Sequence, residues 1–182
     1  KSDPKSDNYD VLLFAVRNIS EAKIPSNIKV ISSYSFYGCK NLTKIEIPQN
    51  SELQRIENNA FSYTQIEHIF IPPCLNNLNG VFRYGSQSLK KFEISKLNKN
   101  FQFKNDQFLL GKSDPKSDNF DVLLFAVRDI SEAKIPSNIK VISSFAFTEC
   151  EQLTKVEIPL NSKLQKIEEY AFIYTPINQI FI

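Results

Sequence analysis

The sequence predicts a β-rich fold of the α/β repeat class, a solenoid in which short strands stack coil upon coil. Three observations support this prediction. The stretch Ser2–Ser33 returns almost unchanged at Ser113–Ser144, so the chain holds two copies of one block. A shorter phrase, Leu-x-x-Ile-x-Ile, recurs within each copy. The 15 Phe and 7 Tyr against only 4 Gly, with no Trp and no Met, favour strands and packed apolar layers over a helical bundle. A short period repeated along a chain is the pattern of a solenoid.

The shorter phrase locates the main strand of each coil. It recurs as "LTKIEIP", "IEHIFIP", "LKKFEIS", "LTKVEIP" and "INQIFI", and its last apolar residues are Ile47, Ile71, Ile94, Ile158 and Ile182. Ile24 and Ile135 precede them in "AKIPS", and the period is about 23 residues except for one longer step between Ile94 and Ile135. Alternate residues of a strand point to opposite faces, so the last two apolar residues of each phrase face inward. A Pro after the strand ends it.

A second phrase precedes each of these strands. It reads "LQRIENNAFSYTQ" from Leu53, "LQKIEEYAFIYTP" from Leu164, "IKVISSYSFYGCKN" from Ile28 and "IKVISSFAFTECEQ" from Ile139. Two apolar residues three apart, followed by an Ala-Phe or Ser-Phe pair and a polar corner, predict a short second strand that runs into one helical or 3₁₀ turn.

The longer step holds an inserted element. Residues 100–127 contain "NFQF", "QFLL" and "FDVLLFAV", separated by "KND" and "GKSDPKSDN", which predicts a β-hairpin or a three-stranded island. We expect one solenoid over residues 1–182, with a partial island at 1–17, repeats at 18–94, the island at 95–130 and repeats at 131–182. Both ends are expected to be cut from a longer array.

The order of these phrases resembles a known family. Ile-Pro, then Ile-x-x-x-Ala/Ser-Phe-x-x-Cys, then Leu-x-x-Ile-x-Ile-Pro, as at Ile24–Pro48 and Ile135–Pro159, is similar to the BspA-like leucine-rich repeats of bacterial and protist surface proteins. The resemblance covers nearly the whole chain. It implies a right-handed, curved leucine-rich-repeat solenoid with a parallel sheet, and a cell-surface or secreted protein that adheres to partners.

Charge and composition exclude several classes of function. The 22 basic and 20 acidic residues give a net charge of +2, unlike the basic stripe of a nucleic-acid binder. No apolar run reaches the ~18 to 20 residues of a membrane-spanning helix, so we expect no membrane insertion within this chain.

No metal or other cofactor is expected. The three cysteines form no C-x-x-C pair, and we expect Cys39 and Cys150 to be free and buried and Cys74 to be accessible. The aspartates of the repeated "SDPKSDN" loop lack the alternate spacing and closing Glu of a calcium loop, so they predict a solvated turn. They are Asp3, Asp7 and Asp10, and in the second copy Asp114, Asp118 and Asp121.

The outward positions of the strands are the candidate binding site. The third position of the phrase gives Lys44, His68, Lys91, Lys155 and Gln179, and the fifth gives Glu46, Phe70, Glu93, Glu157 and Phe181. The Lys and Glu columns are expected to form pairs across neighbouring strands. Phe70 and Phe181 break the charged pattern, and exposed aromatic residues are typical of interaction sites.

These residues predict binding without catalysis. His68 is the only histidine, and the sequence has no Gly-x-Ser-x-Gly turn, so no nucleophile and base can be paired. We expect a non-catalytic module that binds a protein or glycan partner through an extended sheet face. Two alternatives stay open: a carbohydrate-active solenoid enzyme, which needs paired carboxylates on one face, and an intracellular scaffold.

Two Asn-x-Ser/Thr triplets complete the motifs. They are Asn18-Ile19-Ser20 and Asn41-Leu42-Thr43, and the second copy replaces the two Asn by Asp129 and Gln152. They matter only in a secreted protein.

Overall fold

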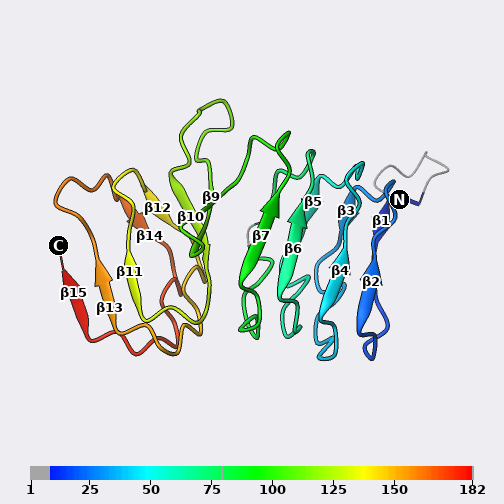
Figure 1. Ribbon diagram of the computed structural model, residues 1–182, viewed down its shortest axis with the longest axis horizontal. Helices are drawn as coiled ribbons and strands as arrows, with labels where there is room; N and C mark the ends of the chain where they lie inside the picture. The colour runs from blue at the N-terminus through cyan, green and yellow to red at the C-terminus, as the bar shows by residue number, and fades with distance from the viewer. Residues whose placement is uncertain (1–8, 79, 182) are drawn as a thin grey trace. The chain divides into compact units, whose positions relative to one another are not determined.

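Two compact units make up the protein, and each is a stack of coils built from short strands (Figure 1). The computed structural model describes residues 9–78 and 80–181. The N-terminal unit is Lys1–Lys99 and the C-terminal unit is Asn100–Ile182.

The N-terminal unit carries its strands in parallel pairs, as the repeat predicts. One sheet has the order β1-β3-β5, and the main strands pair as β2 with β4 and β6 with β7. The coils of β4 and β6 are joined by the Gln65 N–H, which donates to the Leu42 carbonyl at 2.9 Å. The strands are β1 (Val11–Leu12), β2 (Glu21–Lys23), β3 (Val30–Ile31), β4 (Lys44–Glu46), β5 (Arg55–Ile56), β6 (His68–Ile71) and β7 (Lys91–Ile94).

The C-terminal unit repeats this plan and contains the inserted hairpin. Strands β8 and β9 pair antiparallel, β9 pairs antiparallel with β10, and β10 then pairs parallel with β12. Of the two predicted forms, a hairpin or three strands, the inserted element thus has three strands, and it extends the second sheet. The main strands form the parallel sheet β11-β13-β15. The strands are β8 (Gln102–Lys104), β9 (Phe108–Gly111), β10 (Val122–Ala126), β11 (Glu132–Lys134), β12 (Val141–Ile142), β13 (Lys155–Glu157), β14 (Lys166–Ile167) and β15 (Gln179–Phe181).

The core of each unit is a ladder of apolar side chains from successive coils. In the N-terminal unit Ile69 and Ile71 are fully buried and face Phe92 and Ile94 in register. The short second strands, which the sequence also predicts, supply a second buried row that includes Ile31 and Ile56. Burying such side chains stabilises a coil only when its neighbours are in place, so the stack is held together by contacts between coils.

Some positions predicted to face inward are less buried than expected. Ile94 and Ile158 are half-buried and Ile180 is 61% exposed, while Ile182 lies outside the described residues. Among the described residues β7 pairs only with β6 and β15 only with β13, so Ile94 and Ile180 have a neighbouring strand on one side. This does not account for Ile158, because it follows β13, which pairs with both β11 and β15.

The predicted α/β class and the predicted helical corners are wrong, because the described residues contain no helix. The N–H groups of Tyr34, Phe36 and Gly38 donate to carbonyls of the next coil at 3.2, 2.9 and 3.0 Å, while those of Ser35 and Tyr37 donate three residues back at 3.2 and 3.1 Å. Every second backbone N–H therefore donates to a carbonyl outside its own segment, so the continuous series of local hydrogen bonds that a helix needs cannot form. Tyr34 also has a left-handed backbone, with φ of 62°, which interrupts a right-handed helix.

Candidate functional site

The sheet face presents the predicted site residues to solvent. In the N-terminal unit the exposed site residues are Lys44, Glu46, His68, Lys91 and Glu93. Phe70 is half-buried. In the C-terminal unit Lys155 and Glu157 are half-buried, and Gln179 and Phe181 are exposed. The structure thus brings Lys44, Glu46, His68, Phe70, Lys91 and Glu93 together on one unit and Lys155, Glu157, Gln179 and Phe181 together on the other.

The charges on the face form ion pairs, with partners that the sequence pattern did not identify. Glu21 and Lys23 of β2 lie in register with Lys44 and Glu46 of β4. The Nζ of Lys44 is 3.9 Å from Glu21 Oε2, and the Nζ of Lys23 is 3.3 Å from Glu46 Oε2. Because β2 reverses the order of the two charges, every in-register neighbour has the opposite sign. The "EAK" before Ile24 is the feature of the sequence that could have revealed this.

The second copy repeats the arrangement. The Nζ of Lys155 lies 3.5 Å from Glu132 Oε2, and the Nζ of Lys134 lies 3.4 Å from Glu157 Oε2. Exposed ion pairs of this kind contribute about 0–1 kcal/mol each to the free energy of unfolding. Their main effect is that the charged groups of this face are paired with one another.

One strand in each unit departs from this charge pattern. In β6, His68 Nε2 lies 3.5 Å from Glu93 Oε2, and Phe70 lies in register with Glu93. In β15, the ring of Phe181 lies 5.3 Å below the Lys155 ammonium. Each copy therefore places an aromatic ring beside charged side chains at the same position of the face.

Two open hollows adjoin these strands. One, of about 570 Å³, is lined by residues 43–46 together with Glu67 and His68. The other, of about 340 Å³, is bordered by Lys155, Leu160 and Phe181. Leu160 is 94% exposed, so the second hollow has an apolar rim that is open to solvent.

A row of tyrosines on the corners of the N-terminal unit is a second candidate surface, and sequence reasoning missed it. The ring centroids of Tyr34 and Tyr37 are 5.4 Å apart, those of Tyr37 and Tyr63 are 5.3 Å apart, and those of Tyr63 and Tyr84 are 6.3 Å apart. The first three side chains are 53%, 38% and 39% exposed. The second copy interrupts the row, because Thr148 stands where Tyr37 stands in the first.

Close backbone packing holds this row in place. Tyr63 has φ of 59°, and a Cβ at Gly85 would come within 2.5 Å of its ring, so only glycine fits there. The row is therefore a feature of a rigid corner.

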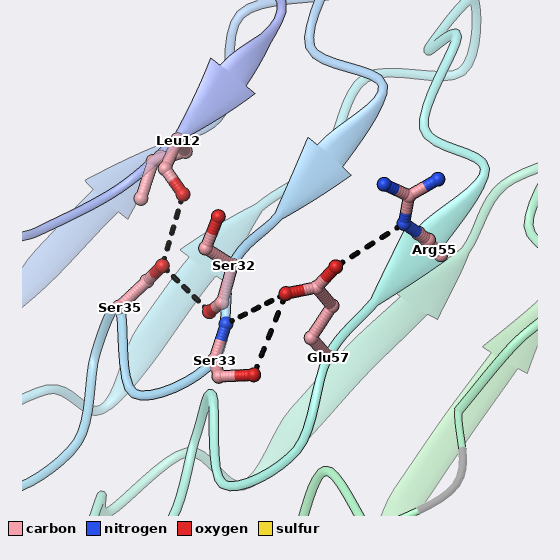
Figure 2. Close-up of polar contacts among 6 residues, drawn as sticks. All are labelled: Leu12, Ser32, Ser33, Ser35, Arg55 and Glu57. Atoms are coloured by element: carbon pink, nitrogen blue, oxygen red, sulfur yellow. Dashed lines mark hydrogen bonds and ion pairs between the residues drawn. The ribbon is translucent and has the colours of Figure 1, made fainter. Parts of the chain in front are cut away.

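Polar contacts fix the corner that carries Tyr34 (Figure 2). The N–H and Oγ of Ser33 donate to Glu57 Oε2 at 3.2 and 3.4 Å, and Arg55 Nε donates to Glu57 Oε1 at 3.2 Å. Ser35 Oγ reaches the preceding coil by donating to the Leu12 carbonyl at 2.9 Å. One carboxylate thus links two coils at this point.

The same link recurs in the second copy. The Ser144 N–H donates to Glu168 Oε2 at 3.1 Å, and Lys166 Nζ lies 3.0 Å from Glu168 Oε1. The hydrogen bond from Lys166 lowers the pKa of the Glu168 carboxyl below its ordinary value, although partial burial opposes this. The repetition indicates a structural role for this carboxylate.

The cysteines are free, as predicted, with Cys39 and Cys150 buried and Cys74 exposed. A guanidinium does lie near each of the two buried cysteines, which the sequence did not reveal: Arg17 Nη1 is 3.8 Å from Cys39 Sγ, and Arg128 Nη1 is 4.0 Å from Cys150 Sγ. Burial nevertheless raises the pKa of the Cys150 thiol, against the opposing effect of Arg128. The same guanidinium donates to the Ala146 carbonyl at 2.8 Å, and burial lowers its own pKa.

We expect one fast-reacting thiol in the folded protein. Cys74 should react with Ellman's reagent at neutral pH, and Cys39 and Cys150 should react only after denaturation, because both are 0% exposed. The Cys74→Ser variant is the control and should abolish the native reaction. Labelling of folded Cys74→Ser at the wild-type rate would contradict this expectation.

The described aspartates of the repeated loop lie in different surroundings. Asp3 and Asp7 lie outside the described residues, and Asp114 and Asp118 are exposed. Asp121 is instead buried and pairs with Lys140 at 2.9 Å. The described part of the chain contains no cluster of three or more His, Cys, Asp or Glu side chains that could hold a metal ion. Within residues 9–78 and 80–181, no helix is long and apolar enough to cross a membrane.

Comparison with known proteins places this geometry in a family. The model of the BspA type leucine-rich repeat region matches residues 12–109 and 120–182, in 6 copies. Among solved structures, the chain is similar to the pneumococcal vaccine antigen PcpA, with a TM-score of 0.78, 22% identity, and coverage of 91% of this chain and 40% of that one. No curated protein matches the sequence.

Two further structures share the fold. A leucine-rich cell surface protein from Faecalibacterium prausnitzii has a TM-score of 0.75 and 21% identity, over 90% of this chain and 41% of that one. A leucine-rich repeat protein from Eubacterium ventriosum has a TM-score of 0.58 and 20% identity, over 90% of this chain and 56% of that one. The chain spans less than two thirds of each of these structures. The predicted leucine-rich-repeat fold is thereby confirmed, and since the family model covers most of the sequence, the chain belongs to the BspA-type leucine-rich repeat family.

Proposed function

We propose that this chain is a non-catalytic binding module, at a cell surface or secreted, which adheres to a protein partner through its sheet face. The observation that carries the proposal is the pair Phe70 and Phe181, which occupy the same position in the two copies, each beside charged side chains. An apolar anchor surrounded by a polar rim is the usual anatomy of a protein interface. The surface location is supported by the family and by the cell surface protein that shares the fold.

The test is to remove the two rings and measure binding. The double variant Phe70→Gln, Phe181→Gln should lose about 30-fold or more of its affinity, because a single aromatic anchor at an interface contributes about 2 kcal/mol or more. Glutamine is preferred to glutamate, since Glu93 and Glu157 are the in-register neighbours and a new carboxylate would repel them. The probes are arrays of immobilised extracellular-matrix proteins and of glycans, and binding to glycans alone would make the partner a carbohydrate.

Two further variants locate the surface. Leu97→Gln is the matched control, because Leu97 is 75% exposed but lies outside the strands of the sheet face, and its binding should equal that of the wild type. Tyr37→Thr copies the residue of the second repeat and breaks the tyrosine row. Loss of binding in Tyr37→Thr, with wild-type binding in the double Phe variant, would exclude the sheet face.

Catalysis is tested separately. Incubating the protein with polysaccharides should produce no new reducing or unsaturated ends, because the carboxylates of the face are ion-paired at regular intervals and are not set as an acid and base about a substrate. Sustained turnover would replace the binding proposal with the enzyme alternative.

A further inference from the structure

Two Asn-x-Ser/Thr triplets lie side by side on neighbouring coils of the N-terminal unit. Asn18 and Asn41 are both exposed and both lie in turns, each three residues before a main strand, β2 or β4. The Thr43 N–H donates to the Ser20 carbonyl at 3.0 Å, and Thr43 Oγ1 donates to the same carbonyl at 3.3 Å. The third residues of the two triplets are therefore in direct contact, at the corner where each main strand begins.

The second copy keeps the backbone of this corner but not the acceptor residues. The Thr154 N–H donates to the Ser131 carbonyl at 3.0 Å, and Thr154 Oγ1 donates to it at 3.4 Å, so the contact is the same. Asp129 and Gln152 stand in place of the two asparagines. Because Ser131 and Thr154 are retained, one substitution would restore each triplet, and the chain thus contains its own matched control.

We propose that Asn18 and Asn41 are acceptor sites for N-linked oligosaccharide when the chain passes through a secretory compartment. The donor is an oligosaccharide linked to a lipid diphosphate. The amide Nδ2 of Asn forms a bond to the anomeric carbon of the sugar, the bond from that carbon to the phosphate oxygen breaks, and the lipid diphosphate leaves with the electron pair. One Nδ2 proton is released, and no oxidant or reductant is involved.

Both asparagines lie at the surface of the folded unit. An N-linked oligosaccharide is bulky and needs a surface position, which the exposed side chains in turns provide. The glycans would stand beside β2 and β4, where the charges of the face are already paired with one another. If the sheet face binds as proposed above, the glycans would direct a partner towards Phe70 on β6, an effect that rests on the proposed function.

The experiment expresses the full chain behind a cleavable leader in mammalian cells and follows its mobility before and after peptide-N-glycosidase F. Digestion in H₂¹⁸O labels each occupied Asn as Asp and identifies it by mass spectrometry. We expect two glycans on the wild type, one on Asn18→Gln, one on Asn41→Gln and none on the double variant. Thr43→Ala should behave as Asn41→Gln, because it removes the hydroxyl of the same triplet while keeping the asparagine.

The second copy supplies the positive control. Asp129→Asn and Gln152→Asn should each add one glycan, since the corner is the same. No glycan on the wild type, or a glycan that survives in the double variant, would overturn the proposal, and a glycan on one site only would overturn it for the other. Binding of the enzymatically deglycosylated protein to the probe arrays is measured in parallel, so that failure of the glycan proposal is distinguished from failure of the binding proposal.

Discussion

Replacing Phe61 by Ala should lower the free energy of unfolding of the N-terminal unit by about 3–5 kcal/mol. Phe61 is 0% exposed, and its ring stacks between those of Phe36 and Phe82. The ring centroids are 5.2 Å apart for Phe36 and 5.9 Å apart for Phe82. The three rings come from successive coils, so the substitution leaves a cavity in the contacts that hold the coils together. In an array where each coil is stabilised by its neighbours, the loss should affect the coils on both sides.

The duplication gives this prediction a matched control. Phe172 occupies the position of Phe61 in the second copy, and its ring centroid is 4.6 Å from that of Phe147. Unlike Phe61, Phe172 is only half-buried. Phe172→Ala should therefore cost less, about 1–2 kcal/mol. Urea unfolding followed by circular dichroism and tyrosine fluorescence measures both, as the chain has no tryptophan. Equal losses for the two variants would show that the complete burial of Phe61 is not what makes its contribution larger.

The strands were predictable because their cause is local. A strand alternates its side chains, so the spacing of Ile45 and Ile47 in one coil is sufficient to place both inside and Glu46 outside, as observed. The island was predictable for the same reason, since "QFLL" and "FDVLLFAV" are separated by turn residues. The parallel pairing followed from the repeat itself.

The corners were not predictable, because their hydrogen bonds are shared with the next coil. The segment that begins at Tyr34 has the local composition of a helical turn, but alternate N–H groups are taken by residues 58–62 of the following coil. No window of the sequence contains both partners. Tertiary pairing therefore overrides the local preference.

The candidate surfaces were predictable only in part. The outward columns followed from alternation, whereas the ion pairs with Glu21 and Lys23 required a strand whose phrase does not match the others. The tyrosine row joins residues of three coils that are far apart in sequence and meet only when the coils stack. Sequence periodicity thus identifies which faces are exposed but not which side chains become neighbours across them.

Acidification should remove stability that depends on Asp121. Its side chain is 3% exposed, the Ser113 N–H and Oγ donate to it at 2.8 and 2.7 Å, and Lys140 Nζ is 2.9 Å away. Burial acts to raise the pKa of this carboxyl, but the hydrogen bonds from Lys140 and Ser113 outweigh burial and hold the pKa below its ordinary value. A carboxyl with a lowered pKa in the folded state contributes stability above its unfolded pKa of about 3.9, and this contribution is lost as pH falls through the folded pKa.

The Asp121→Asn variant tests this account, because it keeps the shape of the side chain and removes its charge. At pH 7 it should be less stable than the wild type by about 3 kcal/mol, since charge-assisted bonds are lost and an amide donor is placed against the donors of Ser113 and Lys140. Asp118→Asn, in the exposed part of the same loop, should have no effect. Urea unfolding from pH 7 down to about pH 2 should show the gap between Asp121→Asn and the wild type closing on the acid side of pH 4, where the wild-type carboxyl becomes protonated. A gap of constant size over this range would mean that the geometry of the Ser113 contacts, and not the charge of Asp121, holds the start of β10 against the loop.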